Sequence, residues 1–233
     1  MSNGIYLAYT GLAAAQADLE VVANNVANIG TTGFRRDHAV FDTVLAAAQP
    51  FARVLPGQID LSPGTHQPTQ NPLNAAIDGD GFFVVQDAQG NELFTRRGDF
   101  RINASGQLVL PNGLPVLGQS GALDVPPGSQ ASLLGDGTLT SESGPIGRLR
   151  MVRFDNPSAL SKVGESMIAA GPEAGLQEVK NPQVAVGFIE GSNVNLSAEM
   201  VQLILATRAF ESTVQSLRMN DQLTDEMIQT YGQ

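Results

Sequence analysis

The sequence contains no cysteine and no tryptophan, and only two histidines among its 233 residues. The absence of cysteine excludes disulfide bonds and a thiol nucleophile. His38 and His66 lie in different segments without paired ligands nearby, so we expect no metal site. The scattered carboxylates have no histidine or defined nucleophile beside them to suggest an acid–base pair. We therefore predict a protein that is not an enzyme, with no catalytic residues, no metal and no cofactor.

Basic residues are also scarce, because 13 Lys and Arg stand against 23 Asp and Glu, for a formal net charge of −10. No basic stripe is available to neutralise phosphates, which argues against nucleic acid as a partner. Most arginines fall in three groups, at 35–36, 96–101 and 148–153, and we interpret them as strand-edge or interface charges. No phosphate loop or dinucleotide fingerprint occurs, so we expect no small-molecule substrate.

Long hydrophobic runs are missing as well. The start of the chain has no apolar signal region, and the first basic residue is Arg35. We therefore expect no cleavable signal peptide and no direct membrane insertion. The polar face of the first predicted helix carries Asp18 and Glu20 without a basic residue, which argues against a membrane-surface helix. If the protein leaves the cytoplasm, it uses a route that does not read a Sec-type signal.

The two ends of the chain carry apolar residues at seven-residue spacing. At the N-terminus one series is Ile5, Leu12, Leu19 and Val26, and a second is Ala8, Ala15, Val22 and Ile29. At the C-terminus the series is Leu196, Leu203, Phe210 and Leu217, with Met200, Val214 and Ile228 beside it. Such stripes predict helices that bury one face against another helix. We expect the first helix to run from about Gly4 to Ile29, with Gly30 left-handed after it, and the second to be capped by Ser197.

The middle of the chain is rich in glycine, proline and short apolar runs. Asn112-Gly113 between two such runs is typical of a hairpin, and Asp87–Gly90 is echoed by Asn103–Gly106, which predicts two similar turns. Asp78–Gly81 resembles the start of a calcium loop, but Phe82 stands at the fifth position and the later Glu is missing. We interpret that segment as a turn.

These patterns predict an α+β fold. Long N- and C-terminal helices pair as an α-helical coiled coil and flank a mostly antiparallel, all-β middle module. The expected domains are residues 1–34 with 190–233 as the terminal helical domain, 35–72 as an extended connector, and 73–189 as a β-rich outer domain. The periodicity alone leaves two interpretations open, since such helices either cap their own domain or assemble with other subunits.

Three separate segments carry distinctive motifs, of which the first is Ala23–Phe34 (ANNVANIGTTGF) and the last is Glu190–Asn195 (EGSNVN), followed by Met200 and Arg208–Glu211. The first is similar to the N-terminal signature of the bacterial flagellar basal-body rod and hook proteins, and the last is similar to their C-terminal signature. Asp78–Val84, Thr95–Phe100, Asn112-Gly113 and Pro115–Gly118 resemble their shared β module. The resemblance covers nearly the whole chain in the right order. Arg35 stands where many members have Lys, so the charge is kept.

The resemblance implies a structural subunit of the flagellar rod, which is synthesised in the cytoplasm, exported by the flagellar type III apparatus and assembled helically across the periplasm. The implied partners are copies of itself, other proximal and distal rod proteins, and the export apparatus. The positions carried over from the signatures are Asn24, Asn25, Asn28, Gly30, Gly33, Phe34, Gly191, Asn193 and Asn195. The expected assembly interface is Ile5, Leu12, Leu19, Val22, Val26, Ile29, Met200, Leu203, Phe210, Val214 and Leu217.

Within the family, the short segment between the first signature and the β module favours a proximal rod protein. A distal rod protein of the same family is the alternative. A periplasmic β binding module with helical ends is a third interpretation, from a different functional class. It would require a folded monomer with a ligand pocket.

Overall fold

The computed structural model describes residues 2–46, 49–164 and 166–231. The contacts divide the chain into two compact units. The helical unit consists of the described residues of 1–27, 37–58 and 195–233, and the β unit consists of 28–36 and the described residues of 59–194. The chain therefore passes from the helical unit into the β unit twice, once for the short segment 28–36 and once for the long segment 59–194.

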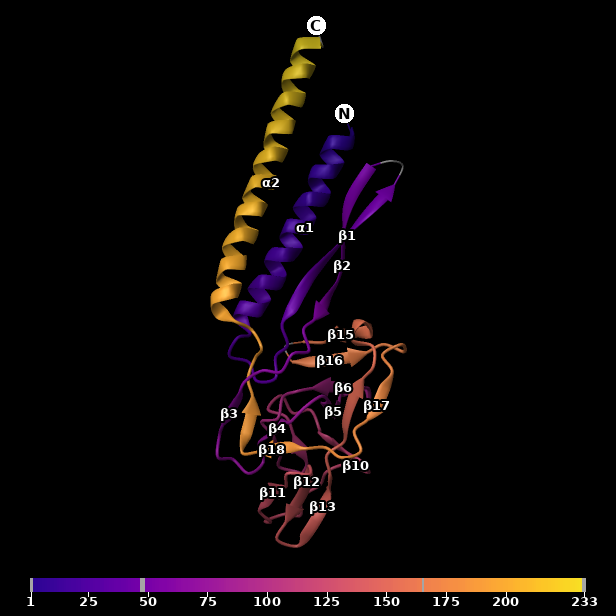
Figure 1. The fold of residues 1–233 in the computed structure, drawn as a ribbon, viewed down its shortest axis with the longest axis vertical. Helices are drawn as coiled ribbons and strands as arrows, with labels where there is room; N and C mark the ends of the chain where they lie inside the picture. Colours follow the sequence, from indigo (N-terminus) through magenta and orange to yellow (C-terminus); the bar gives the residue numbers. More distant parts are fainter. Residues whose placement is uncertain (1, 47–48, 165, 232–233) are drawn as a thin grey trace. The chain divides into compact units, whose positions relative to one another are not determined.

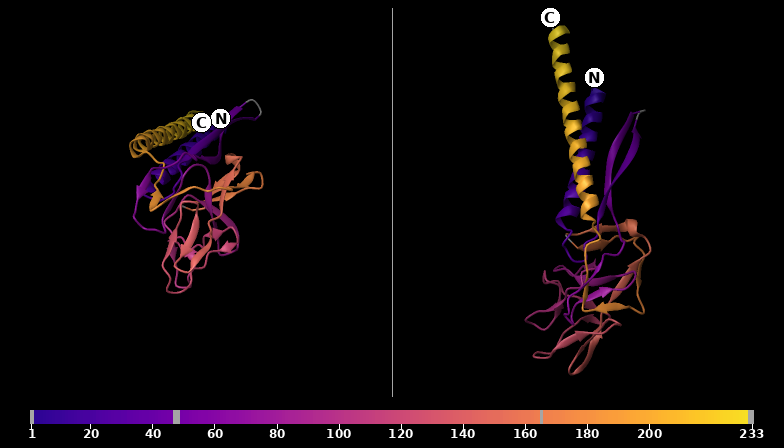
Figure 2. Two further views of the ribbon diagram at one scale, coloured as in Figure 1. Left: turned by 60° about the horizontal axis from the view of Figure 1, so that its bottom comes forward. Right: turned by 60° about the vertical axis from the view of Figure 1, so that its left-hand side comes forward.

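Two helices, α1 (Ser2–Ala27) and α2 (Leu196–Tyr231), run side by side in the helical unit (Figures 1 and 2). They are antiparallel, because Gly11 of α1 lies against Thr213 while Asn25, near the other end of α1, contacts Glu199. A Cβ at Gly11 would lie 3.8 Å from the Thr213 methyl group, an ordinary contact distance, so the two helices pack against each other at this point. No described helix combines the length and apolar character that crossing a membrane requires.

The predicted coiled coil of long terminal helices is wrong. The N-terminal helix has 26 residues and ends at Ala27, whereas α2 has 36 residues and extends beyond the N-terminal end of α1 (Figure 1). Leu196 and Met200, at the start of the predicted stripe, are 45% and 49% exposed and bury little against α1. The buried positions of α2 include Glu199 and Ala206, which the seven-residue series does not contain.

A two-stranded sheet completes the helical unit. It is formed by β1 (Asp37–Ala46) and β2 (Gln49–Ile59), and β1 lies against α1. The sequence predicts an extended connector at 35–72, and the structure has strands over most of 37–59. Proline is uncommon inside strands, yet Pro50 and Pro56 both lie within β2. The prolines therefore hid this strand pair from the sequence analysis.

The β unit contains short strands and one 3₁₀ turn. In chain order its elements are β3 (His66–Pro68), β4 (Ala75–Ile77), β5 (Phe82–Gln86), β6 (Glu92–Thr95), β7 (Arg101–Ile102), β8 (Leu108–Val109), β9 (Leu117–Gly118), β10 (Gly121–Ala122), β11 (Ala131–Leu133), β12 (Thr138–Ser141), β13 (Gly144–Arg148), β14 (Met151–Phe154), η1 (Pro157–Ala159), β15 (Leu160–Lys162), β16 (Met167–Ala170), β17 (Leu176–Glu178), β18 (Val184–Val186) and β19 (Phe188–Glu190). The β-rich, antiparallel middle of the prediction is thus present.

The largest sheet has six antiparallel strands in the order β15-β16-β6-β5-β14-β17. A three-stranded sheet, β11-β12-β13, and four strand pairs, β3–β19, β4–β18, β7–β8 and β9–β10, complete the unit. Both β3–β19 and β4–β18 join early strands to late ones, so the end of this unit's sequence packs against its beginning.

The six-stranded sheet is covered on both faces. Along β5, Phe83 and Val85 belong to one core cluster, and Phe82 and Val84 belong to the other. Successive side chains of a strand point to opposite faces, so a continuous apolar run is what a strand buried on both sides requires. The Phe83 ring meets the edge of Phe100 at a centroid distance of 5.0 Å, within the larger cluster.

The two predicted turns of similar sequence have the same hydrogen bonding. The Asp87 carboxylate accepts from the backbone N–H groups of Gln89 and Asn91, and the Asn103 amide oxygen accepts from the corresponding N–H groups of Ser105 and Gln107. In each turn a glycine, Gly90 or Gly106, has a positive φ of about 90°. This prediction is confirmed, because all of the interactions involved are local.

We expect Phe83→Ala to lower the unfolding free energy of the β unit by about 3–5 kcal/mol, because a fully buried ring would be replaced by a cavity. Urea unfolding followed by circular dichroism measures the change. The control is Leu134→Ala, at a side chain that is 49% exposed, where a change within about 0.5 kcal/mol is expected. Equal losses in the two variants would contradict the assignment of Phe83 to the core.

Candidate functional site

The N- and C-terminal signature segments meet inside the β unit at three buried charged side chains. The Glu190 carboxylate is fully buried and accepts from Arg35 Nη2 at 2.6 Å and from Arg96 Nη1 at 3.2 Å. Its Oε1 also accepts from the backbone N–H of Gly64 at 2.8 Å. We call Arg35, Arg96 and Glu190 the buried ion cluster. It joins the segment after α1, the start of the loop after β6, and the end of β19.

Arg96 is fixed by contacts with three different parts of the β unit. Besides Glu190, its Nη2 donates to the carbonyl oxygen of Gly79 at 2.8 Å, and its guanidinium carbon lies 5.3 Å from the ring centroid of Phe82. Burial lowers the pKa of Arg96 from its ordinary value, and the Glu190 carboxylate opposes that change. The interpretation of the Arg35 and Arg96 groups as strand-edge or interface charges is wrong for these two residues, because both are buried within the unit.

Two glycines allow the backbones to approach around this cluster. Gly33 has φ +69°, and a Cβ on it would lie 2.4 Å from the Arg97 backbone nitrogen. A Cβ on Gly64 would lie 2.1 Å from the carbonyl oxygen of Gly191. The predicted left-handed residue, Gly30, does not have a positive φ, so Gly33 is the residue whose conformation requires glycine.

The Asn193 side chain links the same segments by hydrogen bonds. Its Oδ1 accepts from the backbone N–H of Arg36 at 2.7 Å, and its Nδ2 donates to the carbonyl oxygens of Asp60 and Ser62 at 2.9 and 3.1 Å. Phe34 is fully buried beside this contact, and Lys162 Nζ lies 3.8 Å from the Phe34 ring centroid. An amide suits this position because it both accepts and donates.

A second polar contact lies within the helical unit. Asn25 Nδ2 donates to the carbonyl oxygen of Asp37 at 2.9 Å and to Glu199 Oε2 at 3.4 Å, and Asp37 N–H donates back to Asn25 Oδ1 at 3.0 Å. Asn25 and Glu199 are each 1% exposed. The start of α2 is capped by Asn195, whose Oδ1 accepts from the backbone N–H of Ala198 at 3.1 Å, so the prediction of Ser197 as the cap is wrong.

The structure brings most of the predicted signature residues together, in two places. Gly33, Phe34, Gly191 and Asn193 surround the buried ion cluster of the β unit, and Asn25 and Asn195 act in the helical unit. Asn28 is buried and its Oδ1 accepts from Thr31 Oγ1 at 3.0 Å within the tight turn after α1. Asn24 and Gly30 are exposed.

The predicted interface residues differ in burial. Val22 is buried, and Leu12, Leu19, Val26, Leu203, Phe210, Val214 and Leu217 are half-buried within the helical unit. Met200 is exposed, and Ile29 lies beyond the end of α1, in the β unit. The side chain of Ile5 is outside the described part of the structure.

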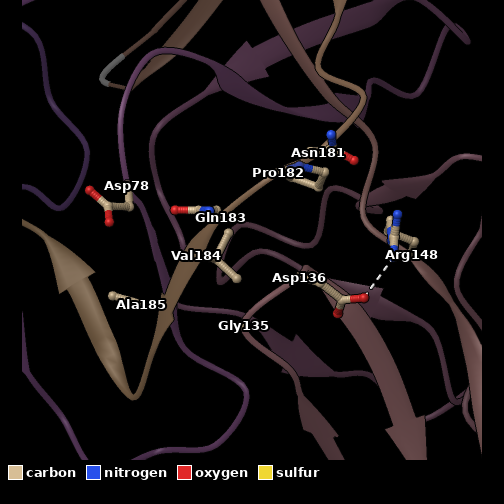
Figure 3. Close-up of a pocket in the computed structure, with 9 residues that line it drawn as sticks. All are labelled: Asp78, Gly135, Asp136, Arg148, Asn181, Pro182, Gln183, Val184 and Ala185. Carbon is tan, nitrogen blue, oxygen red and sulfur yellow. Dashed lines mark hydrogen bonds and ion pairs between the residues drawn. The ribbon is translucent and has the colours of Figure 1, made fainter.

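A hollow in the β unit is lined by two acidic side chains. It has a volume of about 480 Å³, and the acidic residues that line it are Asp78 and Asp136 (Figure 3). Asp136 is already paired with Arg148 Nη2 at 2.6 Å, and hydrogen bonds from the backbone and hydroxyl of Thr138 lower its pKa. Buried Pro182 and Val184 line the same hollow. Among the described residues, no three His, Asp or Glu side chains are grouped to hold a metal ion.

Sequence reasoning missed Glu190, Arg96 and Gly64 as site residues. The available signal was an arginine directly after the first signature, Arg35, and a glutamate at the start of the second, Glu190. Opposite charges in two glycine-containing segments are compatible with a buried ion pair. The two partners lie 155 residues apart along the chain, so the sequence alone did not pair them. Glu199 was also missed as a site residue, and its carboxylate is buried against Asn25.

Comparison with known families gives three matches in chain order. Residues 5–35 match the family described as flagella basal body rod protein, and residues 76–141 match the flagellar hook protein FlgE/F/G D1 domain. Residues 185–230 match the flagellar basal body rod FlgEFG protein C-terminal family. The first and third matches include the segments that carry Arg35 and Glu190, and the second includes Arg96.

Individual relatives match over almost their whole length. The chain is 32% identical over 240 residues to the flagellar basal-body rod protein FlgF of Mesorhizobium japonicum, covering 100% of this chain and 99% of the relative. It is 30% identical over 243 residues to FlgF of Caulobacter vibrioides, with the same coverage. It is 31% identical over 260 residues to FlgG of Buchnera aphidicola subsp. Baizongia pistaciae, covering 97% of this chain and 99% of the relative.

We expect Gly33→Ala to destabilise the β unit by at least about 1 kcal/mol, because the new methyl group would meet the Arg97 backbone and the positive φ disfavours alanine. The matched control is Gly30→Ala, which has no atom within 4 Å of the added Cβ and should change stability by about 0.5 kcal/mol or less. Thermal unfolding of both variants checks the pair. A larger loss at Gly30 than at Gly33 would contradict this account of the turn.

Proposed function

The chain belongs to the flagellar basal-body rod protein family, and from that premise we propose that it is a subunit of the proximal part of the rod, assembled through its terminal helices. Rod proteins are structural, so a non-catalytic role is proposed with it. The partners proposed are other copies of this chain and the neighbouring rod proteins, proximal and distal. Export by the flagellar type III apparatus and a place in the periplasm are part of the same proposal.

The observation that carries the assembly proposal is an exposed apolar face on α2. Of the ten large hydrophobic residues exposed in the described part of the chain, six lie on this helix. They are Leu196, Met200, Val201, Ile204, Leu205 and Met219, each between 45% and 56% exposed. A helix in a self-contained fold keeps its apolar stripe on one buried face, whereas α2 has apolar residues on additional faces. Apolar surface of this kind is typical of a site that another protein covers.

The proposed interface therefore divides the predicted residues into two groups. One group is buried or half-buried within the subunit and consists of Leu12, Leu19, Val22 and Val26 of α1 with Leu203, Phe210, Val214 and Leu217 of α2. Met200 and the exposed residues around it are available for a neighbouring subunit. Each apolar side chain covered by a neighbour contributes roughly 1.5–3 kcal/mol when fully buried, so a few contacts repeated along a polymer suffice for assembly.

Support for the proximal assignment comes from two FlgF relatives whose length is close to that of this chain. The FlgF relatives of Mesorhizobium and Caulobacter align with the whole chain over 240 and 243 residues, so few insertions separate them from this chain. Additional residues are present both in FlgG of Buchnera aphidicola subsp. Baizongia pistaciae, which aligns over 260 residues for 97% of this chain, and in FlgF of Salmonella typhimurium, which aligns over 242 residues for 92%. Sequence identity does not separate the two, because both groups fall near 30%.

We expect Ile204→Asp to leave the isolated subunit folded but to prevent assembly, because a carboxylate buried between subunits without a partner costs several kcal/mol. Motility and rod structures in purified basal bodies are the measurements, with circular dichroism as the test of folding. Gln202→Asp, at an exposed polar residue of the same helix, is the control and should remain functional. Normal rods in the Ile204→Asp strain would refute the proposed interface.

We also expect a strain that lacks this protein to stop rod growth before the distal segment forms, because a proximal subunit precedes the distal ones. Electron microscopy of its basal bodies should reveal no hook. Supplying additional distal rod protein should not restore growth. A complete rod with a hook in the deletion strain would show that the proximal assignment is wrong, while the Ile204→Asp result would still decide the proposed interface.

A further inference from the structure

The buried ion cluster contains more positive than negative charge. Arg35 and Arg96 face the single carboxylate of Glu190, and all three side chains are at most 4% exposed. Among the described residues, no acceptor is found for Arg35 Nε, Arg35 Nη1 or Arg96 Nε. Asp80 also attracts Arg96, but it lies at the exposed turn before β5. The buried state of the two guanidinium groups therefore depends chiefly on the charge of Glu190.

Glu190 also holds the backbone of the segments that meet there. Its carbonyl oxygen accepts from Gly33 N–H at 2.8 Å, and its carboxylate accepts from Gly64 N–H at 2.8 Å. The next residue, Gly191, donates its N–H to the carbonyl oxygen of Thr65 at 2.9 Å. One residue thus connects the segment that follows α1, the segment that precedes β3, and the segment that leads into α2.

The apolar core of the β unit is separate from these contacts. The two core clusters are built on the six-stranded sheet and its neighbours, and no residue of 28–36 or 188–194, all of which the structure describes, belongs to either of them. The core can therefore keep its packing when the cluster opens. Phe34 and Val194 are buried within the two segments but join neither cluster, and the β3–β19 pair adds backbone hydrogen bonds, so polar and ionic interactions supply much of the attachment.

We propose that Glu190 is a charge-dependent latch: its carboxylate holds residues 28–36 and 188–194 on the β unit, and loss of its charge releases both segments together while the sheet remains folded. Because residues 28–36 follow α1 and residues 188–194 lead towards α2, one release loosens the connection of both helices to this unit. The device lies within the β unit and is independent of the proximal or distal assignment.

Hydrogen exchange of the full-length Glu190→Gln variant tests the proposal. Glutamine keeps the size and one acceptor of the side chain but removes the charge that two buried cations require. We expect the amides of Gly33, Arg36 and Gly191 to exchange at least about tenfold faster than in the native chain, as one group. The amides of Val84 and Leu108, which donate within the sheet region, should keep their native rates.

A second variant separates charge from simple loss of contacts. In Glu190→Gln, both buried arginines lack a counter-charge, and adding Arg35→Met removes one of these two cations. Amide exchange at Gly33 and Gly191 should therefore be several-fold slower in the double variant than in Glu190→Gln alone. Glu178→Gln, which removes an exposed carboxylate paired with Arg150, is the matched control and should leave the junction unchanged.

Two results would overturn the latch. One is an equal increase of exchange at the junction and at Val84 and Leu108, because that pattern is global destabilisation. The other is a double variant that exchanges as fast as Glu190→Gln, since the loss would then not arise from uncompensated charge. If Glu190→Gln alone does not fold, recovery of a folded chain in the double variant supports the proposal, and failure to recover overturns it.

Discussion

A carboxylate buried between two arginines determines how the chain is tied together. Taking three charged groups out of water is costly, and the cost is offset only where hydrogen bonds and opposite charges are placed closely. Glu190 meets this condition because Gly33 and Gly64 let neighbouring backbones come near enough to reach it. Two segments from opposite ends of the sequence consequently become part of one β unit, although each is joined covalently to the helical unit.

Each unit buries a different kind of polar group at the place where its own segments meet. In the β unit, apolar packing on both faces of the sheet holds the core, and ionic contacts attach the segments at its margin. In the helical unit, the buried amide of Asn25 fixes one end of α1 against α2 and β1. Polar groups that need specific partners restrict the register of a helix pair more than apolar groups do, since a shift by one residue leaves them unpaired.

The local features could be predicted from the sequence, and the long-range ones could not. The short strands of the middle, such as Phe82–Gln86, follow from short apolar runs, and the turns at Asp87 and Asn103 follow from side chains that bond to their own backbone. The coiled coil was wrong because a seven-residue spacing cannot say which faces of α2 meet α1 and which remain uncovered. The burial of Arg35 could not be seen because its partner, Glu190, lies 155 residues away and only the fold brings them together.

The uncovered apolar residues of α2 also bear on how a polymer of such subunits ends. When every subunit covers a face of its neighbour by the same head-to-tail contact, the subunits inside the array are satisfied, but the terminal one always presents a face with no neighbour. Adding further copies moves that face along without removing it. In the proposed assembly a different protein at the growing end would cover that last face, and the succession of proteins would then limit the length of the array.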